Sequence, residues 1–284
     1  MKKLLSLKAD FFKCVFSLFL IHLVSLFLTN CATKSSLKSV QKQTLAVAHR
    51  GAWKAKGLPG NSIAAFREAI RLKCAGSEFD VNMTADDSLV ITRGPNYHSM
   101  PIEKTLYADL IKVNLPNGEK LPTLREFIIA GIRNNTTTRF FCEIKSSSQG
   151  QERGLYIADK VYKTFTNLKA QRMVTFISFD YEILKSLVKR DSLVDTQYLN
   201  NNKTLEDLER NGIKGANFRY PVWQKHPEYI KLAKQKGLIL NSGTVNDTLT
   251  MDWLIDKKFD YISSDEPHTV IKRSKIKKFK LFNP

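Results

Sequence analysis

Two short apolar runs in the first third of the sequence end in residues that can do chemistry. His49 and Arg50 follow the first run, and Glu78 and Asp80 lie in the second, which spans residues 77–83. Successive side chains of a strand point to opposite faces, so Glu78 and Asp80 share one face. Two carboxylates beside a histidine and an arginine favour a site for a hard cation and an anionic substrate.

A third group of ionisable residues ends the run of residues 139–145. Glu143 and Lys145 are two positions apart and share a face of this predicted strand. All these polar residues lie near the carboxyl ends of predicted strands, and buried charges must be paired or coordinate something. A functional site is therefore the favoured interpretation, and structural salt bridges are the alternative.

Strand and helix patterns alternate from about residue 44 onward. The predicted strands cover residues 45–48, 77–83, 89–92, 139–145, 173–179, 196–199, 216–220, 238–245 and 261–264. The predicted helices cover residues 63–73, 122–132, 155–165, 181–189, 205–210, 226–236 and 251–257. About eight strand–helix units over about 240 residues predict a closed TIM (β/α)8 barrel, with its site at the carboxyl ends of the strands. An open doubly wound sheet is the alternative, but no glycine-rich phosphate loop follows the first strand.

The N-terminal segment differs from the rest of the chain. Lysines precede an apolar run from Cys14 to Leu28, which is too short for a comfortable membrane span and predicts a signal peptide over residues 1–30. The run ends in Leu28-Thr29-Asn30-Cys31, which resembles a bacterial lipoprotein signal with Cys31 as the lipidation site, although Asn30 is larger than usual. We expect an exported, membrane-anchored lipoprotein of a bacterial cell envelope; an uncleaved anchor, or a periplasmic or secreted protein, is the alternative.

The formal net charge is +18, and the excess of basic residues is spread along the chain. A basic tether over residues 31–43 and a basic tail over residues 273–284 flank one expected domain, residues 44–272. These segments suit an anionic membrane surface, whereas no recognisable module indicates nucleic-acid binding. A solvated charged surface without a specific partner is the alternative. Cys74 and Cys142 are expected to be buried thiols, because no cysteine or histidine cluster indicates zinc.

Several motifs occur together in an order that resembles the glycerophosphodiester phosphodiesterase family. They are His49-Arg50-Gly51, Asn61-Ser62 before a helix, Glu78-Phe79-Asp80-Val81, Glu143-Ile144-Lys145, the Asn246 segment and the closing Ser264-Asp265-Glu266-Pro267. The resemblance covers nearly the whole chain after the N-terminal segment. It implies a TIM-barrel enzyme that hydrolyses glycerophosphodiesters, metabolites of phospholipid headgroups, to glycerol 3-phosphate and an alcohol.

The resemblance also implies a role for each matching residue. Glu78, Asp80 and Glu143 would bind a divalent metal, Ca²⁺ or Mg²⁺, which can polarise a phosphoryl oxygen. His49 would be one of two catalytic histidines, and Arg50 and Lys145 would hold the phosphate. Asn61, Arg93 and His98 complete the expected substrate-binding residues.

Four positions depart from the family pattern. Arg93 and Gly94 stand where the family has a histidine and an aspartate, Gly60 replaces a usual glutamate, and Gly243 replaces a common tryptophan. Arginine can bind a phosphate, but its pKa above about 12 prevents it from transferring protons near neutral pH. His98 is either a substitute acid or a solvent-exposed loop residue.

Three functions remain compatible with these residues. The first is metal-dependent hydrolysis, slowed by loss of the second histidine. The second is a non-catalytic lipoprotein that binds a phosphorylated headgroup. The third is hydrolysis of a different substrate in a pocket opened by the missing tryptophan and glutamate.

Overall fold

A computed structural model describes residues 43–282, and their side chains up to residue 277. The predicted signal peptide, Cys31 and nearly all of the tether lie outside the described residues. Gln43 onward forms a compact unit. No helix within residues 43–282 has the length and apolar character that crossing a membrane requires.

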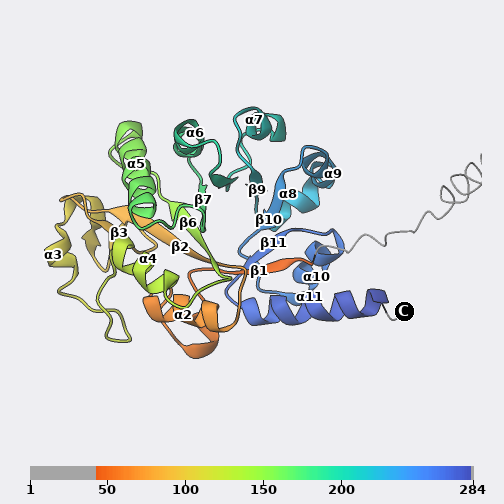
Figure 1. The fold of residues 1–284 in the computed structure, drawn as a ribbon, viewed down its shortest axis with the longest axis horizontal. Coiled ribbons are helices and arrows are strands. Elements are labelled where there is room, and N and C mark those ends of the chain that lie inside the picture. The colour runs from red at the N-terminus through yellow and green to blue at the C-terminus, as the bar shows by residue number, and fades with distance from the viewer. Residues whose placement is uncertain (1–42, 283–284) are drawn as a thin grey trace, which may run out of the picture. The chain divides into compact units, whose positions relative to one another are not determined.

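Eight parallel strands of the described chain close into a barrel (Figure 1). They are β1 (Leu45–Ala48), β2 (Gly76–Met83), β6 (Arg139–Ile144), β7 (Val174–Ser178), β8 (Asp195–Tyr198), β9 (Gly215–Asn217), β10 (Ile239–Ser242) and β11 (Tyr261–Ser264). They follow one another around the ring in chain order, and β1 closes it by pairing with both β2 and β11. The predicted TIM barrel is confirmed, and closure excludes the open sheet.

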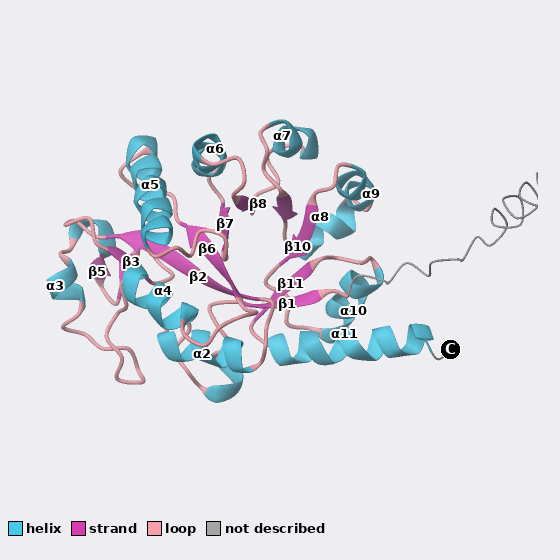
Figure 2. Cartoon of the chain, in the orientation of Figure 1, coloured by secondary structure: helices cyan, strands magenta, loops and turns pink. Residues whose placement is uncertain are grey.

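Helices surround the barrel on its outside (Figure 2). They are α2 (Ile63–Arg71), α4 (Leu124–Ile132), α5 (Gln151–Asn167), α6 (Tyr181–Arg190), α7 (Leu205–Arg210), α8 (Tyr220–Lys225), α9 (Glu228–Gln235), α10 (Thr248–Asp256) and α11 (Pro267–Phe282), with a short 3-10 turn, η1, at Lys54–Lys56. On β2, Phe79 packs against Phe127 of α4 and Phe140 of β6, with ring centroids 4.6 and 6.2 Å apart. Alternation along β2 therefore buries its phenylalanine toward the helices and turns Glu78 and Asp80 the other way.

The segment between β2 and α4 departs from a simple strand–helix unit. The predicted strand at 89–92 exists as β3 (Leu89–Ile91), but it pairs antiparallel with β2 and is not a barrel strand. After it come β4 (Asn96–Tyr97), β5 (Met100–Pro101), a 3-10 turn, η2 (Ile102–Lys104), and α3 (Tyr107–Leu110). This insertion has its own core, formed by Val90, Tyr97, Ile102, Leu110 and Leu121.

Several predicted boundaries differ from the structure, among them the strand expected over 238–245, which ends at Ser242, and the helix expected over 155–165, which spans Gln151–Asn167. The strand expected over 216–220 stops at Asn217, and Tyr220 begins the short helix α8. The expected start of the basic tail, residue 273, falls inside α11. Ser274 is buried, and its hydroxyl donates a hydrogen bond to the Thr44 carbonyl at 2.6 Å. The first part of the predicted tail thus packs on the barrel. Cys74 and Cys142 are buried free thiols, as expected.

Candidate active site

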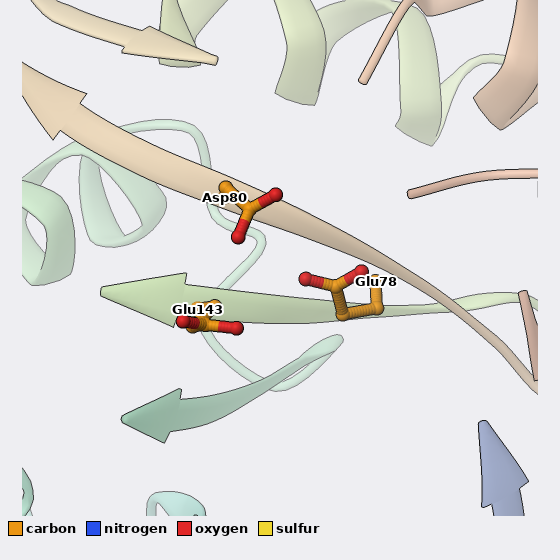
Figure 3. A group of neighbouring side chains, drawn as sticks. All are labelled: Glu78, Asp80 and Glu143. Atoms are coloured by element: carbon orange, nitrogen blue, oxygen red, sulfur yellow. The ribbon is translucent and has the colours of Figure 1, made fainter. Parts of the chain in front are cut away.

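Three buried carboxylates meet at the carboxyl ends of two neighbouring strands. Glu78 and Asp80 project from β2 and Glu143 from β6, and their ligand oxygens all lie within 4.8 Å of one another (Figure 3). Parallel pairing places Asp80 opposite Glu143 in register, which brings the third carboxylate beside the first two. Within the described chain, this acidic cluster is the candidate metal site, and its three side chains are the ones expected from the sequence.

Lys145 lies against the acidic cluster. Its Nζ is 2.5 Å from Asp80 Oδ1 and also donates to Glu143 Oε1. Burial lowers the pKa of Lys145, but the charges of Asp80 and Glu143 and their hydrogen bonds outweigh burial and raise it overall. Lys145 therefore remains protonated and fixes the orientation of two of the three carboxylates.

Glu78 is the member of the acidic cluster that has a buried carboxylate oxygen without a hydrogen-bond partner. Its Oε2 accepts a hydrogen bond from the Arg50 main-chain N at 2.7 Å, whereas its Oε1 is buried without any partner. Burial, followed by the charges of Asp80 and Glu143, raises the pKa of Glu78 well above its ordinary value. A divalent cation would supply the missing partner of Oε1, and three carboxylates are suitable hard oxygen donors, so the residues fit such an ion.

His49 follows β1 and faces the acidic cluster. Its Nδ1 lies 2.8 Å from Asp265 Oδ1, and its Nε2 lies 3.9 Å from Glu78 Oε2. Burial raises the pKa of Asp265, but hydrogen bonds from His49 and Asn246, with the nearby Arg50 charge, lower it overall to about 2. Because an ionised carboxylate only accepts hydrogen bonds, Asp265 assigns the proton to Nδ1 of a neutral imidazole and leaves Nε2 able to accept one.

Asn246 holds Asp265 in place. Its Nδ2 donates to Asp265 Oδ2 at 2.8 Å, and its Oδ1 accepts the Asp265 main-chain N–H at 3.0 Å and the Ser264 hydroxyl at 3.1 Å. The indole of Trp53 adds a contact of 3.3 Å to Asp265 Oδ1. The His49 ring is thus positioned by a chain of hydrogen bonds from two distant segments.

Arg50 acts through its backbone and its side chain. Its φ is 55°, a left-handed conformation that turns its N–H toward Glu78, and Gly51 follows with φ 84°. A Cβ on Gly51 would lie 2.6 Å from the Ala65 Cβ, so only glycine fits this turn. The guanidinium lies over the Trp53 ring at 5.2 Å, and its Nε is buried without a partner.

Asn61 binds a metal-site carboxylate and does not line the cavity. Its Nδ2 donates to Asp80 Oδ2 at 2.8 Å, and its Oδ1 accepts the Asp80 main-chain N–H at 3.2 Å. The expected substrate contact of Asn61 is therefore replaced by a positioning contact with Asp80. Ser62, the next residue, caps α2 by accepting the Ala65 N–H at 3.0 Å.

A cavity of about 470 Å³ opens above the acidic cluster. On one side it is lined by His49, Arg93, Lys145 and the three carboxylates. On the other side it is lined by Ile177, Phe179, Leu199, Asn217, Arg219, Tyr220, Pro221, Gly243, Thr244, Val245, Asp247, Thr250 and Ser263. The arrangement can bind an anion beside a metal ion and move a proton at His49.

Comparison with known proteins identifies the kind of site. The sequence pattern of the Glycerophosphoryl diester phosphodiesterase family matches residues 49–269. The chain belongs to this family. Its members are phosphoric diester hydrolases, and the buried acidic cluster is consistent with their dependence on a metal.

Similar proteins cover the same part of the chain. A glycerophosphodiester phosphodiesterase of Caldanaerobacter subterraneus subsp. tengcongensis is 28% identical over 245 residues, which are 81% of this chain and 97% of that protein. The crystal structure of a glycerophosphodiester phosphodiesterase from Parabacteroides distasonis has a TM-score of 0.81 at 31% identity and covers 84% of this chain and 99% of its own. A phosphodiesterase from Oleispira antarctica, solved with the product sn-glycerol-3-phosphate, has a TM-score of 0.71 at 20% identity and covers 81% of this chain and 96% of its own.

Two of the four substituted family positions, Arg93 and Gly243, line the same cavity. Arg93 follows β3 and lines the cavity, and the Thr92 N–H bonds the Asp80 carbonyl at 3.0 Å, which anchors this segment to β2. A Cβ on Gly60 would lie 3.3 Å from the Arg50 Cβ, so the missing glutamate side chain would start beside Arg50. A Cβ on Gly243 would lie 2.6 Å from the Ser263 Cβ, so a tryptophan cannot replace Gly243 without a shift of β11.

His98 lies apart from the other candidates. It is exposed in the turn between β4 and β5, its ring packs edge-on against Tyr97 at 4.7 Å, and it does not line the cavity. The structure therefore favours the loop-residue interpretation over the substitute acid. His49 is the histidine that the cavity contains among the described residues.

Two features were not predicted from the sequence. Asp265 and Asn246 were noticed as motif residues, but their contacts with His49 and with each other required the closed barrel. Arg219 carried no signal, because it fell within the strand predicted over residues 216–220, where a lone arginine is indistinguishable from a surface residue.

Proposed function

We propose that this chain hydrolyses glycerophosphodiesters to glycerol 3-phosphate and an alcohol, with Ca²⁺ or Mg²⁺ bound by Glu78, Asp80 and Glu143. The observation that carries the proposal is the acidic cluster, with its unpartnered Glu78 oxygen, placed beside the His49–Asp265 pair. The Caldanaerobacter and Parabacteroides relatives, both glycerophosphodiester phosphodiesterases, agree with it, as does the glycerol phosphate bound by the Oleispira protein.

The basic residues of the cavity suit the phosphate of such a diester. When bound, the metal supplies Lewis-acid polarisation of a phosphoryl oxygen. Arg93 supplies charge-assisted hydrogen bonds to the remaining oxygens, and Arg50, which does not itself line the cavity, adds a positive charge beside His49 and Asp265. Lys145 uses two of its three ammonium hydrogens on Asp80 and Glu143, which leaves one for the phosphate.

His49 is the proton-transfer group of this proposal. Asp265 holds its Nδ1 proton, so Nε2 accepts the proton of the attacking oxygen. Arg93 cannot protonate the leaving alcohol, which must then take its proton from solvent. Loss of a general acid typically lowers the rate by about 10²–10⁴-fold, so we expect turnover slower than in two-histidine relatives by a factor in that range.

A non-catalytic binding protein is the second candidate function. It is favoured by Arg93, which adds a phosphate-binding group at the expense of a proton donor. In that case the acidic cluster and the basic residues hold a phosphorylated headgroup without cleaving it.

One assay separates the two candidates. The purified protein is incubated with glycerophosphocholine and glycerophosphoethanolamine in Ca²⁺ or Mg²⁺, and glycerol 3-phosphate release is followed. Release that His49→Ala abolishes supports the hydrolase. Saturable binding of either compound without release supports the binding protein, and neither binding nor release contradicts both.

We also propose that the chain is exported and anchored to an anionic envelope membrane through Cys31, with the basic tether near the surface. The support is the sequence of residues 1–43 alone. The mass of the protein extracted from membranes tests it: a chain beginning at residue 31 with added acyl mass agrees, and an unmodified Cys31 contradicts it.

A further inference from the structure

The charges around the active-site cavity are unevenly placed. The three carboxylates, Lys145 and His49 all project from β1, β2 and β6 or just beyond their ends. On the opposite side, Arg219 follows β9, which is the fourth strand from β2 in either direction around the eight-stranded ring. Arg219 therefore faces the metal site across the barrel mouth.

Arg219 has no counterion within the described residues. Its side chain is exposed to the cavity and forms neither an ion pair nor a hydrogen bond, in contrast to Arg50 and Lys145 on the other side. The single carboxylate on its side of the cavity, Asp247, is already committed. Its Oδ1 accepts the Thr250 N–H at 2.8 Å and caps α10.

Apart from Asp247, the polar groups near Arg219 are small and uncharged. Asn217, Thr244, Thr250 and Ser263 line the adjoining wall and offer hydrogen-bonding groups without charge. Gly243 also lines this wall, where an added Cβ would lie 2.6 Å from the Ser263 Cβ. A ligand that reaches from the acidic cluster to this wall therefore meets one uncompensated guanidinium, whose planar set of donors matches a carboxylate or a phosphate.

We propose that Arg219 binds a second anionic group, a carboxylate or a phosphate, carried by the alcohol portion of the diester. The proposal rests on the proposed function, because the diester phosphate must occupy the metal site for its alcohol to point across the cavity. It makes this chain selective for diesters of anionic alcohols over those of neutral or cationic ones.

The test compares substrates that differ in the charge of the alcohol. The compounds are glycerophosphocholine, glycerophosphoglycerol, whose alcohol portion is uncharged, its terminally phosphorylated derivative, and the matching diester of glyceric acid. The last two distinguish a phosphate from a carboxylate as the recognised group. The value of kcat/KM is measured for each in excess Ca²⁺ with the native protein, Arg219→Gln and Arg125→Gln. Arg125 is an exposed arginine of α4 outside the cavity, so its variant removes the same charge elsewhere.

We expect the native protein to have a kcat/KM about 10- to 100-fold higher for a diester of an anionic alcohol than for glycerophosphoglycerol. This is the usual effect of a hydrogen bond to a charged group. Arg219→Gln should remove most of that preference, and Arg125→Gln should keep it. An unchanged ratio in Arg219→Gln, an equal loss in Arg125→Gln, or a native preference for the choline diester would overturn the proposal.

The same comparison works without turnover. If no diester is cleaved, the proposed hydrolysis fails, and the affinities of the same four compounds are measured by titration calorimetry in Ca²⁺. A preference for the anionic compounds that depends on Arg219 would still support the second anion site. Equal affinities for anionic and neutral compounds would reject it.

Discussion

The two sides of the active-site cavity differ in how their charged side chains are paired. On the side of β1, β2 and β6, most ionisable groups are held by a partner, His49 by Asp265 and Asp80 by Asn61 and Lys145, whereas Arg93 has no such partner within the described residues. On the side of β7 to β11, the wall is apolar or uncharged apart from Asp247, which caps α10, and Arg219, which has no partner within the described residues. Buried charges must satisfy one another, so a change on the first side disturbs several groups. The exposed loops of the second side can change singly, which suits them to select the substrate.

The largest expected difference between the two sides of the cavity appears when one carboxylate on each side is replaced by its amide. Glu78→Gln should lower the hydrolysis rate by about 10³-fold or more, because it removes a charged donor from the metal site. Asp247 lines the same cavity and caps the N-terminus of α10. The Asp247→Asn variant preserves this cap, because asparagine caps a helix as well as aspartate does. We expect it to change the rate by less than about threefold. Steady-state release of glycerol 3-phosphate measures both, and similar losses would contradict the division.

The next effect is a gain. Arg93→His with Gly94→Asp restores the two residues that the family usually has and supplies a proton donor for the leaving alcohol. An added Cβ at Gly94 would lie 3.3 Å from the Asn96 carbonyl oxygen, so the substitution requires this carbonyl to move by a few tenths of an ångström. We expect the rate to rise by about 10²-fold. If the rate does not rise and thermal stability is unchanged, the low activity has another cause, and the substitutions at Gly60 and Gly243 are the first to test.

Metal binding should change stability in a pH-dependent way. The pKa of Glu78 is raised above its ordinary value of 4.5, so the metal-free folded protein retains a proton that the unfolded chain releases. The contribution of Glu78 to the stability of the metal-free protein is therefore largest below about pH 4.5. It is lost as the pH rises through the raised pKa of Glu78. A divalent cation replaces the proton, so excess Ca²⁺ should raise Tm by about 5 °C more at about pH 8 than at about pH 5. Calorimetric scans with Ca²⁺ or a chelator test this, and an equal shift at both pH values would count against it.

The smallest effect tests how tightly the second side is built. Gly243→Ala places a Cβ 2.6 Å from the Ser263 Cβ, and the overlap should cost about 1–3 kcal/mol of unfolding free energy. Ser263→Gly removes the atom that the new methyl group meets. In a double-mutant cycle by urea denaturation, Ser263→Gly should recover part of the cost, and strict additivity would show that the contact does not matter.

The barrel and the acidic cluster could be predicted from local patterns. Glu78 and Asp80 share a face because strand alternation is a local property, and Glu143 joins them because parallel strands end at one edge. The orientation of β3 could not be predicted, since a short apolar run looks the same in either direction. Helix α8 has only six residues, too few to show a helical period.

The partners of the site residues depend on distant segments. Asp265 reaches His49 across 216 positions of sequence, and only the closed ring brings β11 beside β1. Lys145 was expected to hold phosphate, but its contacts with Asp80 and Glu143 depend on the register between β2 and β6. Which strands face each other across the barrel mouth cannot be predicted from a local sequence pattern, so Arg219 was not recognised as a site residue.

The contact of Lys145 with two metal-site carboxylates sets the charge balance of the centre. With all groups ionised, three carboxylates and one ammonium leave two negative charges in excess, the complement of a divalent cation. A monovalent ion would leave the centre negative and repel a phosphodiester anion. With a divalent ion the centre becomes neutral, and attraction of the diester then falls to Arg50, Arg93 and the opposite wall.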